Sequence, residues 1–158
     1  MASVKDKHPN IHVVIAGDGY EREALAQLCI DLEVTNHVTI LGFCDNIPAF
    51  LKACNLYVHP AIIEPFGIAI IEAMAAKKCV IATGIEGALE IVQNGETGIL
   101  VAPMDSEEIA AAIINIYKNP DTSRTMGEKG RQRVEEVFDI RVTLEKYQNV
   151  YKKLCNYN

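Results

Sequence analysis

The chain has 158 residues, of which 49% are hydrophobic and 23% are charged, so it is long enough for one globular domain with a substantial core. Its formal net charge of -6 argues against a surface for nucleic acid. The five cysteines form no C-x-x-C pair, which favours free thiols in a reducing compartment over disulfides or a zinc site. No apolar run could span a membrane and the first ten residues are polar, so we expect a cytoplasmic protein.

Short apolar runs predict strands, and the amphipathic or capped segments between them predict helices. The expected strands cover residues 11–17, 38–42, 56–59, 79–83 and 97–101. The expected helices cover residues 21–32, 47–54, 68–76, 88–93, 105–117, 123–137 and 141–154. Because the strands alternate with helices and are apolar on both faces, we expect an α/β fold. Its core would be a Rossmann-like parallel sheet with helices on both faces.

Ligands of such sheets bind beyond the carboxyl ends of the strands. The loops expected there are residues 17–20, 42–45, 59–67 and 83–90. Each of these four loops contains glycine and at least one carboxylate. The sequence therefore predicts a ligand site built mainly from these four segments.

The stretch EPFGIAIIEAM, residues 64–74, is the most informative part of the chain. Glu64 opens a turn, Pro-Phe-Gly follows, and a helix begins whose first free N–H groups would attract an anion such as a phosphate. Glu72 has apolar neighbours nearly all round this helix, so we expect a buried carboxylate that needs a polar partner. Sugar hydroxyls are suitable donors for it. A purely structural pair, with Glu64 at the helix dipole and Glu72 bonded to a cation, is the less favoured interpretation.

A weaker signal lies in the loop after the first strand. Gly17 and Gly19 resemble half of a dinucleotide-binding fingerprint, but Arg22 stands where its third glycine would be. A plain tight turn is at least as compatible with this pattern as contact with a ligand.

Two further loops carry signals that could be functional or structural. His59 ends a strand near the Glu64 loop and could contact a ligand, although a structural role at the strand end is slightly favoured. Gly87 follows another strand and could offer its N–H group to a phosphate, or the segment could be purely structural. No residues show metal-ligand spacing, so no metal is expected.

Five segments match one family in order. They cover residues 15–19, 38–42, 55–60, 64–75 and 90–101. Together they resemble the C-terminal half of a retaining glycosyltransferase of group 1, which has the GT-B fold. The resemblance covers almost the whole chain, and the two-glutamate segment at residues 64–75 is its most specific part.

The resemblance implies roles for particular residues. Glu64 would be the catalytic residue, contacting the hydroxyls of the donor sugar or stabilising charge at its anomeric carbon. Phe66 and Gly67 would offer backbone N–H groups to the sugar or diphosphate, and Glu72 would bind the ribose hydroxyls. The other residues expected at the donor are Gly17, Gly19, Phe43 near the base, His59 and Gly87.

The resemblance also implies what the chain lacks. In the family, residues 3–10 correspond to the end of a helix that follows an additional first strand and a loop with an Arg and a Lys. A separate N-terminal domain holds the acceptor. Residues 1–158 would thus form a donor-binding domain, truncated relative to the family, without its first strand and inactive alone. Since the lost strand lies in the middle of the family's sheet, either neighbouring strands close the gap or another chain fills it by self-association.

The expected function is transfer of a sugar from a nucleotide-sugar to an acceptor sugar or lipid, without a cofactor, in polysaccharide or glycolipid biosynthesis. The full-length enzyme could then work at the membrane periphery. Two alternatives remain: a non-catalytic nucleotide-binding or assembly module, and a nucleotide-sugar epimerase of similar fold. The incomplete glycine pattern and the acidic start of the first helix argue against a nicotinamide-dependent enzyme.

Overall fold

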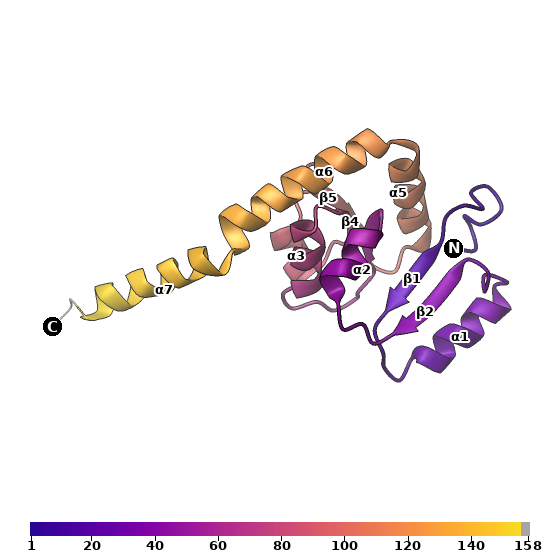
Figure 1. Ribbon diagram of the computed structural model, residues 1–158, viewed down its shortest axis with the longest axis horizontal. Coiled ribbons are helices and arrows are strands. Elements are labelled where there is room, and N and C mark those ends of the chain that lie inside the picture. Colours follow the sequence, from indigo (N-terminus) through magenta and orange to yellow (C-terminus); the bar gives the residue numbers. More distant parts are fainter. Residues whose placement is uncertain (156–158) are drawn as a thin grey trace.

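Strands and helices alternate through the first two thirds of the chain in the computed structural model, which describes residues 1–155 (Figure 1). In chain order the elements are β1 (Val13–Ala16), α1 (Arg22–Asp31), β2 (Val38–Gly42), α2 (Ile47–Ala53), β3 (Leu56–His59), α3 (Ile68–Ala75), β4 (Cys79–Thr83), α4 (Glu86–Ile91), β5 (Gly98–Val101), α5 (Ser106–Lys118), α6 (Pro120–Arg133), the π-helical segment η1 (Val134–Phe138) and α7 (Ile140–Cys155). The α/β class and the order of elements are confirmed. The expected helix at residues 123–137 is instead α6 plus η1.

The strands form two parallel sheets and not one continuous sheet. β1 pairs with β2, while β3, β4 and β5 form a second sheet in that order. Neither β1 nor β2 pairs with β3 in the described residues. Closure of the gap by the neighbouring strands, one of the two expected alternatives, is therefore not what the structure shows.

The core lies around the three-stranded sheet. β4 is buried along its whole length, and Ile70, Ala73 and Met74 of α3 pack in the core beside it. Gly127 lets α6 come close to the connection between α3 and β4, because a Cβ atom there would overlap the carbonyl oxygen of Lys77. Helices therefore cover this sheet closely.

The two-stranded sheet is less well covered. Val14 of β1 and Leu41 of β2 are both exposed. The expectation of two apolar, covered faces thus holds for β4 but not for β1 and β2.

Two arginines of α6 hold the ends of α3 and α4. Arg131 donates to the carbonyl oxygen of Ala75 at 2.8 Å, at the last turn of α3. Arg133 donates to the carbonyl oxygens of Glu90 and Ile91, both at 2.7 Å, at the last turn of α4. Carbonyl groups at helix ends lack partners within their own helix, and a cation there also complements the helix dipole. α6 therefore braces two helices whose opposite ends face the candidate site.

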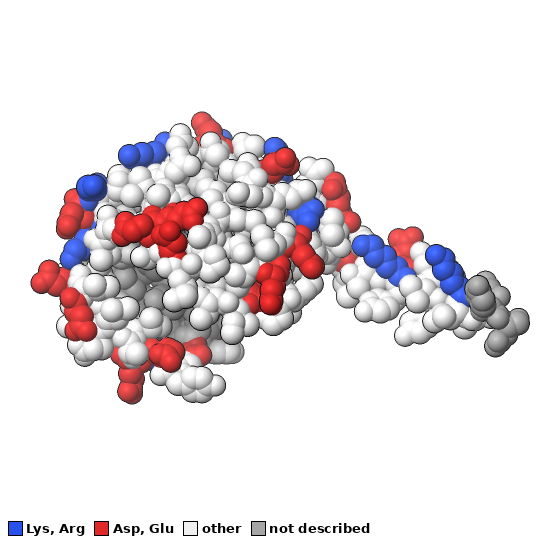
Figure 2. Space-filling model, turned by 180° about the vertical axis from the view of Figure 1, so that it is seen from behind, with Lys and Arg blue, Asp and Glu red and all other residues white. Residues whose placement is uncertain are grey.

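α7 extends away from the rest of the molecule as an amphipathic helix without a buried side chain (Figure 1). Acidic side chains outnumber basic ones on the face of the body seen in Figure 2, as the net charge of -6 leads one to expect. Within residues 1–155, no helix has both the length and the apolar character that crossing a membrane requires.

Candidate functional site

The loop between β3 and α3 is held in place from its backbone. The hydroxyl of Thr83, a buried residue at the end of β4, donates to the carbonyl oxygen of Ala61. The backbone N–H group of Gly87 donates to the carbonyl oxygen of Glu64 at 3.1 Å. Gly87 must be glycine, because a Cβ atom would lie 2.7 Å from Cα of Phe66 and closer still to its carbonyl group. β4 and α4 therefore fix the segment that carries Glu64.

The carboxylate of Glu64 is bonded through both oxygens. Oε1 accepts from the backbone N–H group of Phe66 at 3.3 Å, and Oε2 lies 3.0 Å from Nε2 of His59. The N–H group of Phe66, which was expected to meet the donor, is thus engaged within the loop. The side chains of His59 and Glu64 are 14% and 23% exposed, so solvent reaches this pair only partly. These two hydrogen bonds consequently hold the Glu64 carboxylate in one orientation.

The N-terminus of α3 begins immediately after this carboxylate. Gly67 has φ +99° and caps the helix without a side-chain hydrogen bond. A left-handed backbone of this kind favours glycine. Among residues 1–155, the N–H groups of Gly67 and Ile68 have no hydrogen-bond partner. Gly67 itself is buried and Ile68 is exposed, so this helix tip can meet an anionic group on the side of Ile68.

Glu72 lies on the same helix but is not buried, so this part of the prediction is wrong. α3 buries Ile70, Ala73 and Met74, while Glu72 is exposed and Ile68 is 65% exposed. The helix covers the sheet with one face only, and Glu72 falls on the other. Its carboxylate makes no hydrogen bond or ion pair with the rest of the described chain. An exposed, unpaired carboxylate remains available to a ligand. Because Glu72 is not buried, it does not need a polar partner in order to be stable there.

Glu72 stands at the edge of a groove of about 1010 Å³ that α2, α3 and α6 line. Leu51 of α2 and other apolar side chains are part of its lining. The groove does not include Glu64, so the two acids do not line one cavity in this structure.

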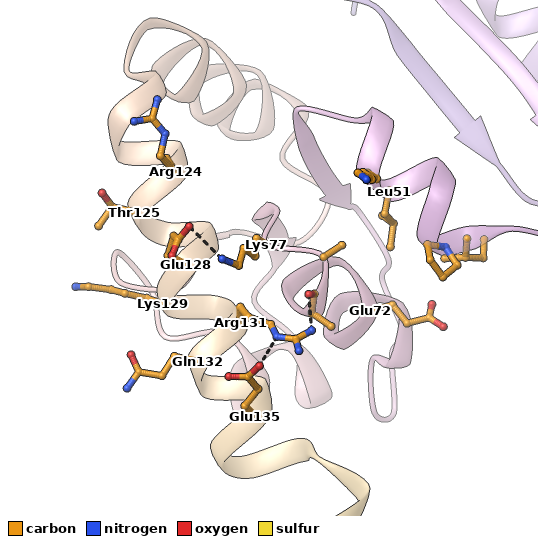
Figure 3. Close-up of a pocket in the computed structure, with 15 residues that line it drawn as sticks. Leu51, Glu72, Lys77, Arg124, Thr125, Glu128, Lys129, Arg131, Gln132 and Glu135 are labelled. Carbon is orange, nitrogen blue, oxygen red and sulfur yellow. Dashed lines mark hydrogen bonds and ion pairs between the residues drawn. The ribbon is translucent and has the colours of Figure 1, made fainter.

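Two basic side chains on the opposite wall of this groove already form ion pairs with other residues. Figure 3 shows the Glu72 carboxylate directed away from α6, where two ion pairs join Lys77 with Glu128 and Arg131 with Glu135. These basic side chains therefore do not neutralise Glu72.

The two glutamates nevertheless act on one group, Tyr57 of β3. Burial and the negative charges of Glu72 and Glu64, in that order of size, raise the pKa of Tyr57 to about 12. The hydroxyl of Tyr57 therefore stays protonated at neutral pH.

The glycine turn after β1 has fewer free N–H groups for a ligand than expected. The N–H group of Gly17 donates to the carbonyl oxygen of Gly42 at 2.8 Å, and that of Gly19 donates to the side chain of Asp18 at 2.9 Å. Open space lies where a side chain would stand at Gly17 and Gly19, so a ligand can approach their backbone. Phe43, after β2, is 78% exposed and presents a free ring on the next loop.

Two other predicted donor contacts have protein partners instead. Both ring nitrogens of His59 are engaged, Nδ1 with the hydroxyl of Tyr57 at 3.1 Å and Nε2 with Glu64. The N–H group of Gly87 is bonded to Glu64, and the residue is buried. Neither group is open to a ligand in this structure, because each already supports the Glu64 loop.

Sequence reasoning missed Tyr57 and Thr83. Alternate residues of a strand point to the same side, so the place of Tyr57 two positions before His59 was a usable signal that the two rings lie together. Thr83 had no local signal, since its partner Ala61 comes from another segment. In residues 1–155, no three His, Cys, Asp or Glu side chains are placed to hold a metal ion.

Parallel strands flanked by helices, with a carboxylate loop and a helix N-terminus at their carboxyl ends, define a Rossmann-like α/β domain. The chain belongs to the glycosyl transferases group 1 family, whose model matches residues 1–133. It is 32% identical over 139 residues to N-acetyl-alpha-D-glucosaminyl L-malate synthase of Bacillus anthracis, covering 88% of this chain and 36% of that protein.

Two solved structures share the fold closely. Anabaena Alr3699/HepE in complex with UDP and glucose matches with TM-score 0.87 and 29% identity, over 93% of this chain and 42% of that one. A glycosyltransferase from Rickettsia africae matches with TM-score 0.89 and 29% identity, over 99% of this chain and 43% of that one. The chain thus spans less than half of the length of these relatives.

Proposed function

We propose that this chain is the donor-binding part of a retaining glycosyltransferase. The observation that carries the proposal is the orientation of the Glu64 carboxylate beside the free helix tip of α3, with Glu72 unpaired on the same helix. Each oxygen of Glu64 accepts one hydrogen bond and keeps a further lone pair for a sugar hydroxyl. A carboxylate that is followed directly by an anion-attracting helix tip can bind a sugar joined to a diphosphate, because the carboxylate accepts from sugar hydroxyls and the helix tip attracts the phosphates.

The chemistry follows from charge. As the bond between sugar and diphosphate breaks, the diphosphate gains negative charge and the anomeric carbon becomes positive. N–H groups at Gly67 and Ile68 would stabilise the negative charge on the diphosphate. The carboxylate of Glu64 would stabilise the positive charge at the anomeric carbon. No metal is needed in this scheme, since the helix tip takes the role of a cation.

The nucleoside part of the donor would lie on the neighbouring loops. Glu72 would hold the ribose through its unpaired carboxylate. Phe43 and the open turn at Gly17 and Gly19 would lie beside the base, because an exposed ring and an accessible backbone are both present there.

The relatives support a nucleotide-sugar as the ligand. The Anabaena protein is described in complexes with UDP and with UDP-glucose. Other relatives are named as a glycogen synthase of Mycobacterium tuberculosis and a capsular polysaccharide biosynthesis glycosyltransferase of Staphylococcus aureus. We infer a role in polysaccharide or glycolipid synthesis. The acceptor would be held by a part of the enzyme outside the matched region.

The separation of the strands into two sheets leaves strand edges at which a second copy of the chain could pair. β1 and β3 each have an edge without a partner strand in the described residues. A strand from a second copy or from another part of the enzyme would bridge them. Sedimentation of this chain at several concentrations tests the first version, and a well-folded monomer throughout would eliminate it.

Calorimetric titration with UDP-glucose, GDP-glucose and ADP-glucose tests the function directly. We expect one of the three to bind, in buffer with EDTA as well as without it, and Glu72→Gln to weaken binding about tenfold, as for loss of hydrogen bonds to a charged group. Glu145→Gln, on the exposed α7, is the matched control and should bind like the original chain. Absence of binding to any nucleotide-sugar would favour a non-catalytic module. Transfer assays on the 158 residues alone should show no product.

A further inference from the structure

Three side chains near the candidate site form a continuous hydrogen-bonded chain. The hydroxyl of Tyr57 lies 3.1 Å from Nδ1 of His59, and Nε2 of the same ring lies 3.0 Å from Oε2 of Glu64. The rings of Tyr57 and His59 are stacked, with centroids 6.0 Å apart and planes 23° apart. Both come from β3, where residues two apart share one side, and Glu64 reaches them from the following loop.

The chemistry of the three groups sets the direction of each bond. An ionised carboxylate only accepts hydrogen bonds, so Nε2 of His59 carries a proton and donates it to Glu64. In the neutral imidazole Nδ1 then has a lone pair and accepts from the hydroxyl of Tyr57. The raised pKa of Tyr57 keeps that hydroxyl protonated, as the direction requires.

We propose that Tyr57 is a positioning residue, which acts through His59 to hold the Glu64 carboxylate in the orientation that receives the donor sugar. This inference rests on the proposed function of Glu64. The hydroxyl of Tyr57 keeps His59 in the tautomer that donates to Glu64. The N–H group of Phe66 holds the second carboxylate oxygen, so the acid is oriented before a ligand arrives.

A simpler explanation is that the chain of bonds only fastens the loop. Two other contacts already do this from the backbone: Thr83 bonds to the carbonyl oxygen of Ala61, and Gly87 bonds to that of Glu64. Loss of the Tyr57 hydroxyl should therefore leave the fold and the loop in place. The change Tyr57→Phe separates orientation of the carboxylate from folding, because the ring and its packing remain.

The first experiment reads the tautomer. With ¹⁵N-labelled histidine at pH 8, long-range ¹H–¹⁵N spectra should show His59 as the Nε2–H form. In Tyr57→Phe the Nδ1 resonance should move by several ppm or a second tautomer should appear, whereas Tyr147→Phe, on the exposed α7, should change nothing. An Nδ1–H tautomer in the original chain, or identical His59 signals in Tyr57→Phe, would overturn the inference.

The second experiment measures binding of UDP-glucose or of whichever nucleotide-sugar the chain binds. We expect Tyr57→Phe to weaken binding about threefold to tenfold, the usual loss for one neutral hydrogen bond. His59→Leu should weaken it at least as much, while His59→Gln should recover most of it, because an amide can also donate and accept. Equal binding by Tyr57→Phe and the original chain contradicts the positioning role. No binding by the original chain contradicts the proposed function itself, and the tautomer then still decides whether the hydrogen-bonded chain exists.

Discussion

The N–H group of Gly87 donates to the carbonyl oxygen of Glu64 at 3.1 Å, so the start of α4 holds the loop that presents the candidate catalytic acid. These residues belong to different segments, since Glu64 precedes α3 and Gly87 follows β4. The bond requires α4 to approach the loop so closely that no side chain fits at position 87.

Gly87→Ala should displace this loop. The added Cβ would come within 2.7 Å of the Phe66 backbone, and overpacking of this kind costs about 1–3 kcal/mol. We expect a lower melting temperature in thermal unfolding and weaker nucleotide-sugar binding. Gly84→Ala is the matched control at the same end of the sheet, because its nearest contact would be 3.5 Å. Unchanged stability in Gly87→Ala would show that the loop can shift without cost, and would contradict the close packing of α4 against it.

Arg133→Met should destabilise the fold while leaving the site chemistry untouched. The change keeps an apolar stem but removes two hydrogen bonds to the end of α4 and the contact of the guanidinium with the ring of Phe138, whose centroid lies 5.6 Å from Cζ. Each hydrogen bond from a charged donor contributes about 1.5–3 kcal/mol, so urea unfolding should show a loss of at least about 1.5 kcal/mol. Arg124→Met on the same helix loses only an exposed pair with Asp121 and should cost less than about 0.5 kcal/mol. Equal losses in both variants would contradict the bracing role of Arg133.

Tyr57 should ionise in a late phase of an alkaline titration followed at 295 nm. Its pKa is raised to about 12, whereas a free tyrosine titrates near pH 10. Because the folded-state pKa lies above the unfolded value, the stability that the neutral phenol contributes is fully present below pH 10. It is lost as the pH rises from 10 to 12. The late phase should vanish in Tyr57→Phe and persist in Tyr20→Phe, whose ring is fully exposed.

Removal of α7 should leave the rest of the fold intact. None of its side chains is buried, and Ile140, Leu144 and Tyr147 are each more than half exposed. A chain that ends at Asp139 should melt within a few degrees of the original in differential scanning calorimetry, because almost no apolar surface is uncovered. A large drop in melting temperature would mean that α7 packs against something in solution.

Much of this protein was determined locally. The order of strands and helices follows from the spacing of apolar residues. Asn46 and Asp105 stand at the starts of two of these helices and cap them with their side chains, a preference that is also local. The Glu64–Pro–Phe–Gly turn and the helix after it are likewise local, because proline and glycine restrict or free the backbone by themselves.

Other features depended on packing between distant segments. The exposure of Glu72 was decided by which face of α3 meets β4, and an almost wholly apolar helix does not reveal that face. The engagement of His59 and Gly87 was decided by a loop that folds back to meet them. The division into two sheets also appeared only in three dimensions, because strand pairing is a contact between segments and leaves no mark on the periodicity of either one.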